Sequence, residues 1–243
     1  MTREVIDGRR PAVHARPQRR CHRAPHRPEE EDVFLIEIAH PEGALSDGDR
    51  EMLAAEIVSG LTGAGEEEAP EETMRRARRM THVAFRGLGA WRTGDGPVPD
   101  GAAPPVWVTV TLPEAWRDES ARHSMGWIRR AVRKVDRAHG WERTGGDLWI
   151  NVVGVADGCI GLNGRAATAD TVLEYMTEEF HAAMEEGRIE VPEGRLLDPV
   201  CGMQVRNGPR ALTLEHGGTL YGFCAQGCLD VYAKRNGIEA PAA

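Results

Sequence analysis

One strand–helix–strand pattern occurs twice in this chain of 243 residues, and this duplication limits the fold more than any other feature. The first copy starts with the apolar run VFLIEI, passes through a Pro-Glu-Gly turn into an amphipathic helix, and returns in MTHVAFRGL. The second copy, about seventy residues later, starts with PVWVTVTLPEAW and returns in DLWINVVGVADG. Each copy ends in a glycine-rich loop. The chain therefore contains an internal repeat of two β-α-β units.

The helix between the strands of each copy determines how those strands pair. A crossover helix brings two strands of one sheet side by side in parallel. We therefore predict an α+β fold, in which two fused β-α-β units form a sheet of four principal strands with both helices on one face. Ser46 or Asp47 is a suitable N-cap for the first helix. Apolar residues four apart predict a third helix over residues 168–186.

These motifs resemble the tautomerase superfamily, whose type member is 4-oxalocrotonate tautomerase. The resemblance covers residues of about 33–166 and rests on LIEIAHPEGALS in the first copy and on WVTVTLPEA and VADGCIGLNGR in the second. Tandem fusions of this unit are known in the family and generally assemble as trimers. The resemblance thus implies a homo-oligomer, with a trimer as the expected form.

The residues on which catalysis in that family depends are not matched in this sequence. The family uses a proline at the mature N-terminus as its acid or base, because an apolar pocket lowers the pKa of the secondary amine. Aligning the turns places Phe34 and Val106 at this position, and Pro105 is an internal residue whose nitrogen is a non-basic amide. Met80 and Trp149 stand where the family has an arginine that holds substrate carboxylates. We therefore do not expect the proline-dependent isomerase reaction here, and whether the chain is an enzyme stays open.

A tryptophan with neighbouring arginines is a candidate site for a small anionic ligand. Trp91 matches the aromatic position of the family's glycine-rich loop, and Arg86 and Arg92 lie close to it in sequence. Arginines can hold an anion through bidentate contacts. The alternative is that the arginines are solvated and the tryptophan packs between subunits.

Three further side chains are weak catalytic candidates. Cys159 would need a nearby base and a depressed pKa to act as a nucleophile, and a buried structural thiol is the favoured interpretation. Glu37 and His82 lie on predicted strands and are possible replacements for the missing base. A solvent-facing position in the strand alternation explains each of them equally well.

The strongest chemical signal is a cluster of three cysteines near the end of the sequence. Cys201, Cys224 and Cys228 follow the spacing C-x22-C-x3-C, with a predicted hairpin, ALTLEHGGTLYGF, inside the long interval. The segment after Cys224 is predicted to be helical, so that its two cysteines lie on one face of the first turn. Three converging thiolates are soft ligands that suit one Zn²⁺ or Cu(I) ion. The alternatives are reduced structural cysteines or a disulfide.

This segment resembles the YHS domain, a small metal-binding module related to treble-clef zinc folds. The resemblance covers residues of about 196–238 and rests on DPVCGM, LYGFC and the final GC pair. It departs from the family at Gly222 and Ala225, where His or Ser is frequent. The resemblance implies a metal site formed by the three cysteines.

A closed metal site usually has four ligands, and the fourth is not evident from the spacing. Asp198 lies three residues before Cys201, and His216 lies at the predicted tip of the hairpin. Water, a substrate or a group from a neighbouring chain is the other alternative.

Composition shifts divide the chain into four parts. Residues 1–32 read as a disordered basic leader, residues 33–187 as the tandem body, 188–195 as a linker and 196–238 as the metal module. Eight arginines fall within the first 28 residues, whereas the whole chain has a net charge of -8. A basic tail can contact nucleic acid, but the body is acidic and lacks the interleaved aromatic residues of such proteins, so nucleic acid is not the expected partner.

The remaining composition indicates the cellular setting. The sequence contains no apolar run long enough to cross a membrane, so we expect no membrane partner. Five cysteines without a secretory signal indicate a reducing compartment, and we predict a cytoplasmic protein.

Two functions fit these features. The first is a metal-binding protein on an oligomeric tautomerase-like body that lacks the catalytic proline. The alternative is an isomerase-type or lyase-type enzyme that acts on a small carbonyl or enol acid with a different base, with or without the metal in its active site.

Overall fold

The computed structural model describes residues 35–62 and 70–239, and within them both β-α-β units are present. The central sheet has four strands in the order β2-β1-β5-β6. The bounds are β1 (Leu35–Pro41), β2 (His82–Leu88), β5 (Val106–Pro113) and β6 (Leu148–Val155). Strands pair in parallel within each unit, and the two units join through the antiparallel pair β1 and β5. The predicted α+β class and parallel pairing are confirmed.

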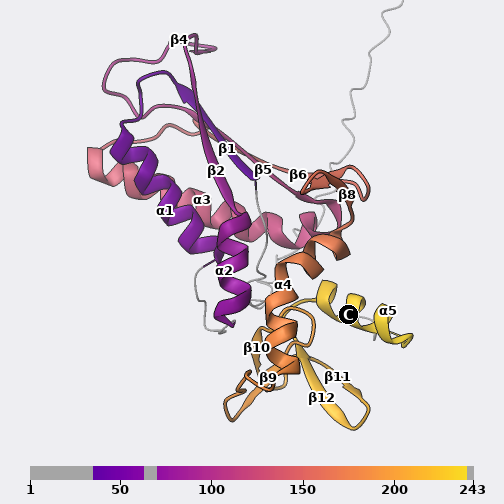
Figure 1. The fold of residues 1–243 in the computed structure, drawn as a ribbon. Coiled ribbons are helices and arrows are strands. Elements are labelled where there is room, and N and C mark those ends of the chain that lie inside the picture. Colours follow the sequence, from indigo (N-terminus) through magenta and orange to yellow (C-terminus); the bar gives the residue numbers. More distant parts are fainter. Residues whose placement is uncertain (1–34, 63–69, 240–243) are drawn as a thin grey trace, which may run out of the picture.

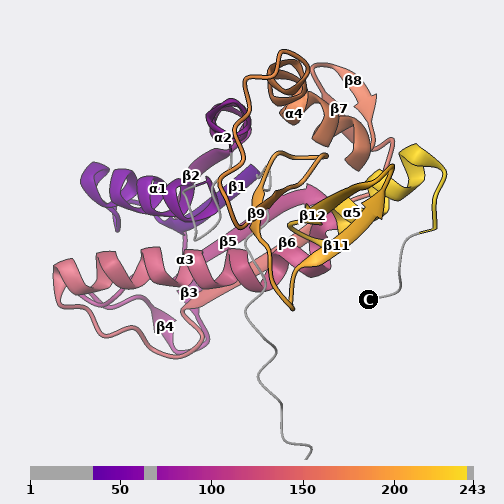
Figure 2. The ribbon, with the colours of Figure 1, turned by 90° about the horizontal axis from the view of Figure 1, so that it is seen from below.

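Two long helices cover one face of this sheet, as predicted. They are α1 (Asp47–Thr62) and α3 (Arg117–His139), which lie side by side (Figure 2). Ser46 caps α1, because its hydroxyl accepts from the N–H of Asp49 at 3.2 Å while its own N–H donates to the Asp49 carboxylate at 3.0 Å. This reciprocal pair is a capping box with aspartate in place of glutamate.

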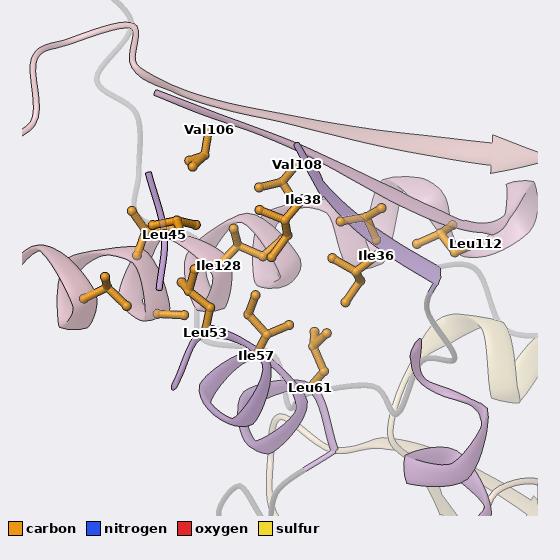
Figure 3. Close-up of a cluster of buried hydrophobic side chains, with 14 residues drawn as sticks. Ile36, Ile38, Leu45, Leu53, Ile57, Leu61, Val106, Val108, Leu112 and Ile128 are labelled. Atoms are coloured by element: carbon orange, nitrogen blue, oxygen red, sulfur yellow. The ribbon is translucent and has the colours of Figure 1, made fainter. Parts of the chain in front are cut away.

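The alternation of buried and exposed side chains along the strands explains which face of the sheet the helices cover. Every second residue of β1 and β5 points toward the helices, and these residues form the core shown in Figure 3. In it, Ile38 and Val108 pair across the two units and pack with Ile57 of α1 and Ile128 of α3. The core is thus shared between the two copies of the repeat.

The opposite face of the sheet is not covered by any described element (Figure 1). Four large apolar side chains point outward on it, with Trp107 55% exposed and Trp149 58% exposed, and with Leu35 and Val153 also exposed. Large apolar side chains exposed together on one face are characteristic of a protein interface.

A second layer, formed by the helices α2 (Glu71–Met80) and α4 (Ala169–Glu185), lies beyond one end of the sheet. The sequence pattern predicted α4 but not α2. Arg76 of α2 joins the two helices, because its guanidinium binds Glu178 at 2.7 Å, Glu179 at 2.8 Å and the carbonyl oxygen of Tyr175 at 2.7 Å. The helix pair extends from the hairpin over residues 160–167 to the C-terminal module over residues 195–239 (Figure 1).

Short elements complete the two units. The glycine-rich loops form two hairpins, β3 (Arg92–Thr93) with β4 (Gly96–Pro97) and β7 (Ile160–Leu162) with β8 (Arg165–Ala167). A 3-10 turn, η1 (Glu114–Trp116), precedes α3.

The C-terminal module consists of residues 195–239 and contains two small sheets and one helix. Its elements are β9 (Arg195–Leu197), β10 (Gln204–Arg206), β11 (Leu212–His216), β12 (Thr219–Phe223) and α5 (Gln226–Asn236). The hairpin and the helix therefore lie where the sequence predicted them. The module packs against α2 and α4 through a shared apolar cluster, and the Thr73 hydroxyl donates to the carbonyl oxygen of Cys201 at 3.1 Å.

Some predictions concern residues outside the described ranges. The basic leader over residues 1–32 is among them, and so is Phe34, the residue at the family's proline position in the first copy. Within the described residues, no helix has the length and apolar character needed to cross a membrane.

Candidate metal centre and neighbouring cavity

Three separate backbone segments bring the clustered cysteines together. Cys201 lies in the turn after β9, Cys224 follows the last residue of β12, and Cys228 lies in the first turn of α5. The hairpin of β11 and β12 returns the chain to the first cysteine, because its strands pair from Leu212 with Phe223 to His216 with Thr219. The long interval in the cysteine spacing therefore holds β10 and this hairpin.

The three thiols and one carboxylate form a compact, buried group. Cys201 Sγ lies 3.5 Å from Cys224 Sγ, and Cys224 Sγ lies 3.6 Å from Cys228 Sγ. Together with one carboxylate oxygen of Asp198, the four candidate ligand atoms all lie within 4.8 Å of one another. All four residues are buried, with Asp198 at 0% exposure. Three soft thiol donors and one carboxylate that converge in this way can hold a metal ion.

Asp198 also holds the two cysteine-bearing turns in place. Its Oδ1 accepts from the backbone N–H groups of Val200 at 2.8 Å and Cys201 at 3.3 Å. Its Oδ2 accepts from the N–H of Cys224 at 3.0 Å. One carboxylate therefore connects the turn after β9 to the end of β12. Because a carboxylate has about four acceptor sites, one remains for a cation.

The charges of this group favour a bound cation. Burial raises the pKa of the Cys201 thiol, but the hydrogen bonds from the thiols of Cys224 and Cys228 outweigh it and hold that pKa well below its usual range. Burial raises the pKa of Asp198 well above its usual range, and the negative charge of Cys201 adds to this effect. Two negative charges would thus repel each other within one buried space, and a bound metal cation would compensate for both charges.

The two residues that the sequence suggested as a fourth ligand lie in different places. Asp198 belongs to the group, whereas His216 does not. The Nδ1 of His216 lies 2.9 Å from the hydroxyl of Tyr232, and the two rings meet edge to face.

One residue beside the metal centre was not singled out from the sequence. His181 lies on α4, and its buried Nε2 has no hydrogen-bond partner in the described part of the chain. Burial lowers the pKa of His181, and the positive charge of Arg235 lowers it further. Its position one residue after Phe180 gave no signal, because a histidine in an amphipathic helix is unremarkable by itself.

A cavity of about 580 Å³ lies between the end of the sheet and the helices α2 and α4. Two of the sequence candidates, His82 and Cys159, line it, together with Arg76, Arg79 and Tyr175. Cys159 is exposed, so the favoured interpretation as a buried structural thiol is wrong. Arg79 has no ion-pair partner among the described residues, which leaves one guanidinium at the cavity available for an anion.

The other candidates lie away from this cavity. Glu37 and Arg86 form an exposed ion pair with each other at 2.8 Å on neighbouring strands. Trp91 packs edge to face against Trp107 with 5.3 Å between ring centroids, and Arg92 is exposed in β3. The structure therefore brings together His82 and Cys159 but not the Trp91 group.

Comparison with protein families identifies the C-terminal segment. Residues 196–235 match the model of the YHS domain. The resemblance that DPVCGM and the cysteine spacing indicated is thereby confirmed for the YHS module. Among curated proteins, no relative matches the chain.

Several solved structures are similar to the chain at low sequence identity. A probable enzyme from the thermophilic fungus Aspergillus fumigatus is 16% identical with a TM-score of 0.44, covering 66% of this chain and 99% of that chain. A native fused 4-OT is 17% identical with a TM-score of 0.37, covering 54% and 94%. A member of the cis-3-chloroacrylic acid dehalogenase family is 14% identical with a TM-score of 0.39, covering 63% and 96%.

Proposed function

We propose that this protein binds one metal ion, Zn²⁺ or Cu(I), at Cys201, Cys224 and Cys228, with Asp198 as the fourth ligand. The observation that carries the proposal is that four buried ligand atoms converge within 4.8 Å inside the segment that matches the YHS model. A disulfide would use two of the thiols and leave the third thiol and the carboxylate buried without a counter-charge. A metal ion uses all four groups.

A metal at this position connects three separate segments of the module. The turn after β9, the end of β12 and the start of α5 each supply a cysteine. Because such a site does not exist in the unfolded chain, the free energy of metal binding adds to the stability of the fold. Thiolates donate strongly to the ion, so a storage, sensing or structural role is favoured over Lewis-acid catalysis.

Metal content tests this proposal directly. The protein is purified without metal-affinity resin, and its metal-to-protein ratio is measured by elemental analysis. We expect one ion per chain in the wild type and a loss of at least about tenfold in occupancy for Cys224→Ser, because removing one thiolate breaks a closed set of ligands. Cys159→Ser is the matched control, since Cys159 is an exposed thiol outside the group.

Equal metal occupancy in the wild type and in the triple variant Cys201→Ser, Cys224→Ser, Cys228→Ser would refute the proposal. Loss of metal in the Cys159→Ser control would show instead that metal content depends on the number of thiols in the protein and not on the four residues of this site.

The body of the protein supports a second, separable proposal, in which the cavity binds a small anionic carbonyl or enol acid. The observation that favours it is that Arg79, His82 and Cys159 line one cavity. Arg79 would hold the acid group, and His82 is the candidate base for a proton transfer between enol and keto forms.

The enol form of oxaloacetate is a suitable probe for this second function. We expect the protein to accelerate its ketonisation, and Arg79→Gln to lower kcat/KM by at least about tenfold, because an Arg–carboxylate contact is lost. Arg92→Gln is the matched control, because Arg92 is exposed and does not line the cavity. Acceleration that is unchanged in both Arg79→Gln and His82→Gln would exclude the cavity as the site.

The uncovered face of the sheet supports a homo-oligomer. Trp107 and Trp149 are more than half exposed on it, and burying two tryptophans against further copies of the chain would remove a large apolar area from water. The family resemblance implies a trimer. A disulfide-free thiolate cluster also fits a reducing compartment such as the cytoplasm.

A further inference from the structure

A row of arginines runs along the outer face of α3. Five exposed arginines belong to it, and they are Arg122, Arg129, Arg130, Arg133 and Arg137. The residues of α3 that are buried against the core, such as Ile128 and Val132, lie on the opposite side of the helix. At a rise of about 1.5 Å per residue, the row is about 22 Å long.

The charges in this row are not balanced by the protein itself. Among the described residues, no ion pair involves any of the five arginines, whereas Lys134 on the flank of the same helix pairs with Glu56. The chain has 38 acidic residues for 30 basic ones, yet no acidic residue lies on this face between the first and the last arginine of the row. Like charges four residues apart on a helix repel each other. The row is therefore a segregated positive surface on an acidic protein.

The surface between these side chains is hollow rather than filled. A space of about 420 Å³ is bounded by Gly126 and by the four arginines from Arg129 to Arg137. A side chain at Gly126 would meet no atom within 4 Å, so the glycine leaves the floor of this space open. An anion can approach the helix backbone closely there.

We propose that this row binds the phosphate backbone of a nucleic acid. A guanidinium contacts a phosphate through two parallel hydrogen bonds, and the row consists of arginines alone. Its length corresponds to about six nucleotides along one strand, at a rise of about 3.4 Å each. A long row of this kind fits an extended polyanion better than a single small phosphate.

An acidic protein partner fits the surface less well. Interfaces between proteins have an apolar centre with aromatic or aliphatic anchor residues. Of the exposed large hydrophobic side chains in the described residues, only Met125 belongs to α3. Backbone recognition without base contacts predicts binding that is independent of nucleotide sequence.

The inference modifies an expectation from the sequence. The acidic net charge of -8 argued against nucleic acid, but a net charge says nothing about how the charges are arranged. In the folded protein, the periodicity of α3 collects arginines on one face, and the one acid between Arg122 and Arg137, Asp136, is buried and pairs with Arg143.

The test uses the full chain and a fluorescently labelled DNA duplex of about 20 base pairs and random sequence, with anisotropy measured between about 50 and about 200 mM salt. The row variant combines Arg129→Gln, Arg133→Gln and Arg137→Gln. The control variant combines Arg75→Gln, Arg78→Gln and Arg188→Gln, which are exposed arginines in ion pairs elsewhere and change the net charge equally. Circular dichroism confirms that both variants are folded.

We expect the wild type to bind at low salt, and the row variant to bind at least about tenfold more weakly, because three phosphate contacts are lost. The salt dependence, as the slope of log K against log salt, should also become shallower by about 2.7, since each lost contact contributes about 0.9. The control variant should stay within about twofold of the wild type.

Three results would overturn the proposal. In the first, the wild type does not bind the duplex at low salt. In the second, the row variant and the control variant bind the duplex equally more weakly than the wild type. In the third, polyglutamate competes with the labelled duplex as strongly as unlabelled duplex of equal charge does. The last result would assign the surface to an acidic protein.

Discussion

Asp198→Ala is expected to destabilise the protein by about 3 kcal/mol or more, because three buried backbone N–H groups lose their acceptor at about 1 kcal/mol or more each. These are the N–H groups of Val200, Cys201 and Cys224. The measurement is urea unfolding of the metal-free protein, followed by circular dichroism. Using metal-free protein separates the hydrogen bonds from any contribution of the ion.

Asp230→Ala is the matched control for this prediction. Asp230 is an aspartate of the same module, but it is exposed, and within the described ranges its carboxylate accepts only from the side chain of Gln226. Its replacement should change the free energy of unfolding by less than about 0.5 kcal/mol. If both variants lose the same stability, the carboxylate of Asp198 does not organise the turns.

The conservative variant Asp198→Asn separates the two roles proposed for this carboxylate. An amide retains one acceptor oxygen and replaces the other by a donor, so the N–H of Cys224 or those of Val200 and Cys201 remain satisfied. The visible spectrum of the Co²⁺-loaded protein reports the ligands themselves. We expect the tetrahedral bands to shift in this variant, and an unchanged spectrum would assign Asp198 to positioning alone.

Much of the body could be predicted because its pattern is local. The alternating strands and the crossover helices indicated four strands with both long helices on one face, and Ile38 and Ile57 lie in the core accordingly. The helix α2 could not be predicted in this way. Its ten residues include six charged side chains on a short amphipathic segment, and its stability comes from partners such as Glu178 and Glu179 that are distant in sequence.

The candidate metal centre was also predictable in part, because its pattern of cysteines is local in sequence. The three cysteines follow a spacing that a hairpin and a helix can close, so their convergence was expected. The choice between Asp198 and His216 depended on side-chain direction, which the sequence does not show. The sequence did not predict that His82 and Cys159 line one cavity. They lie on different copies of the repeat, and the cavity forms only where α2 and α4 pack near the end of the sheet.

Gly202→Ala is expected to have the second large effect, because this glycine lies where the C-terminal module contacts the body. Its φ is +87°, in the region that disfavours other residues. An added Cβ would also lie 2.7 Å from the ring of Phe180 on α4 and 2.9 Å from Pro70. We expect a loss of about 2 to 5 kcal/mol in the free energy of unfolding, the sum of about 1 to 2 for the backbone and about 1 to 3 for overpacking.

Gly194→Ala separates these two contributions. Gly194 has a similar φ of +79°, but an added Cβ would meet no atom within 4 Å. This control should therefore lose only the backbone part, about 1 to 2 kcal/mol. Both variants are measured by urea unfolding. Equal losses in the free energy of unfolding would show that Phe180 and Pro70 move to accommodate the added Cβ without loss of stability.

The larger loss at Gly202 would have a consequence for the metal centre. Gly202 follows Cys201 directly, and the carbonyl oxygen of Cys201 accepts from Thr73 of α2. The turn that carries this cysteine is thus held from both sides, by Asp198 within the module and by the helix pair of the body. Displacing the turn should lower metal occupancy even though no ligand is changed, and elemental analysis of Gly202→Ala beside Gly194→Ala measures this coupling.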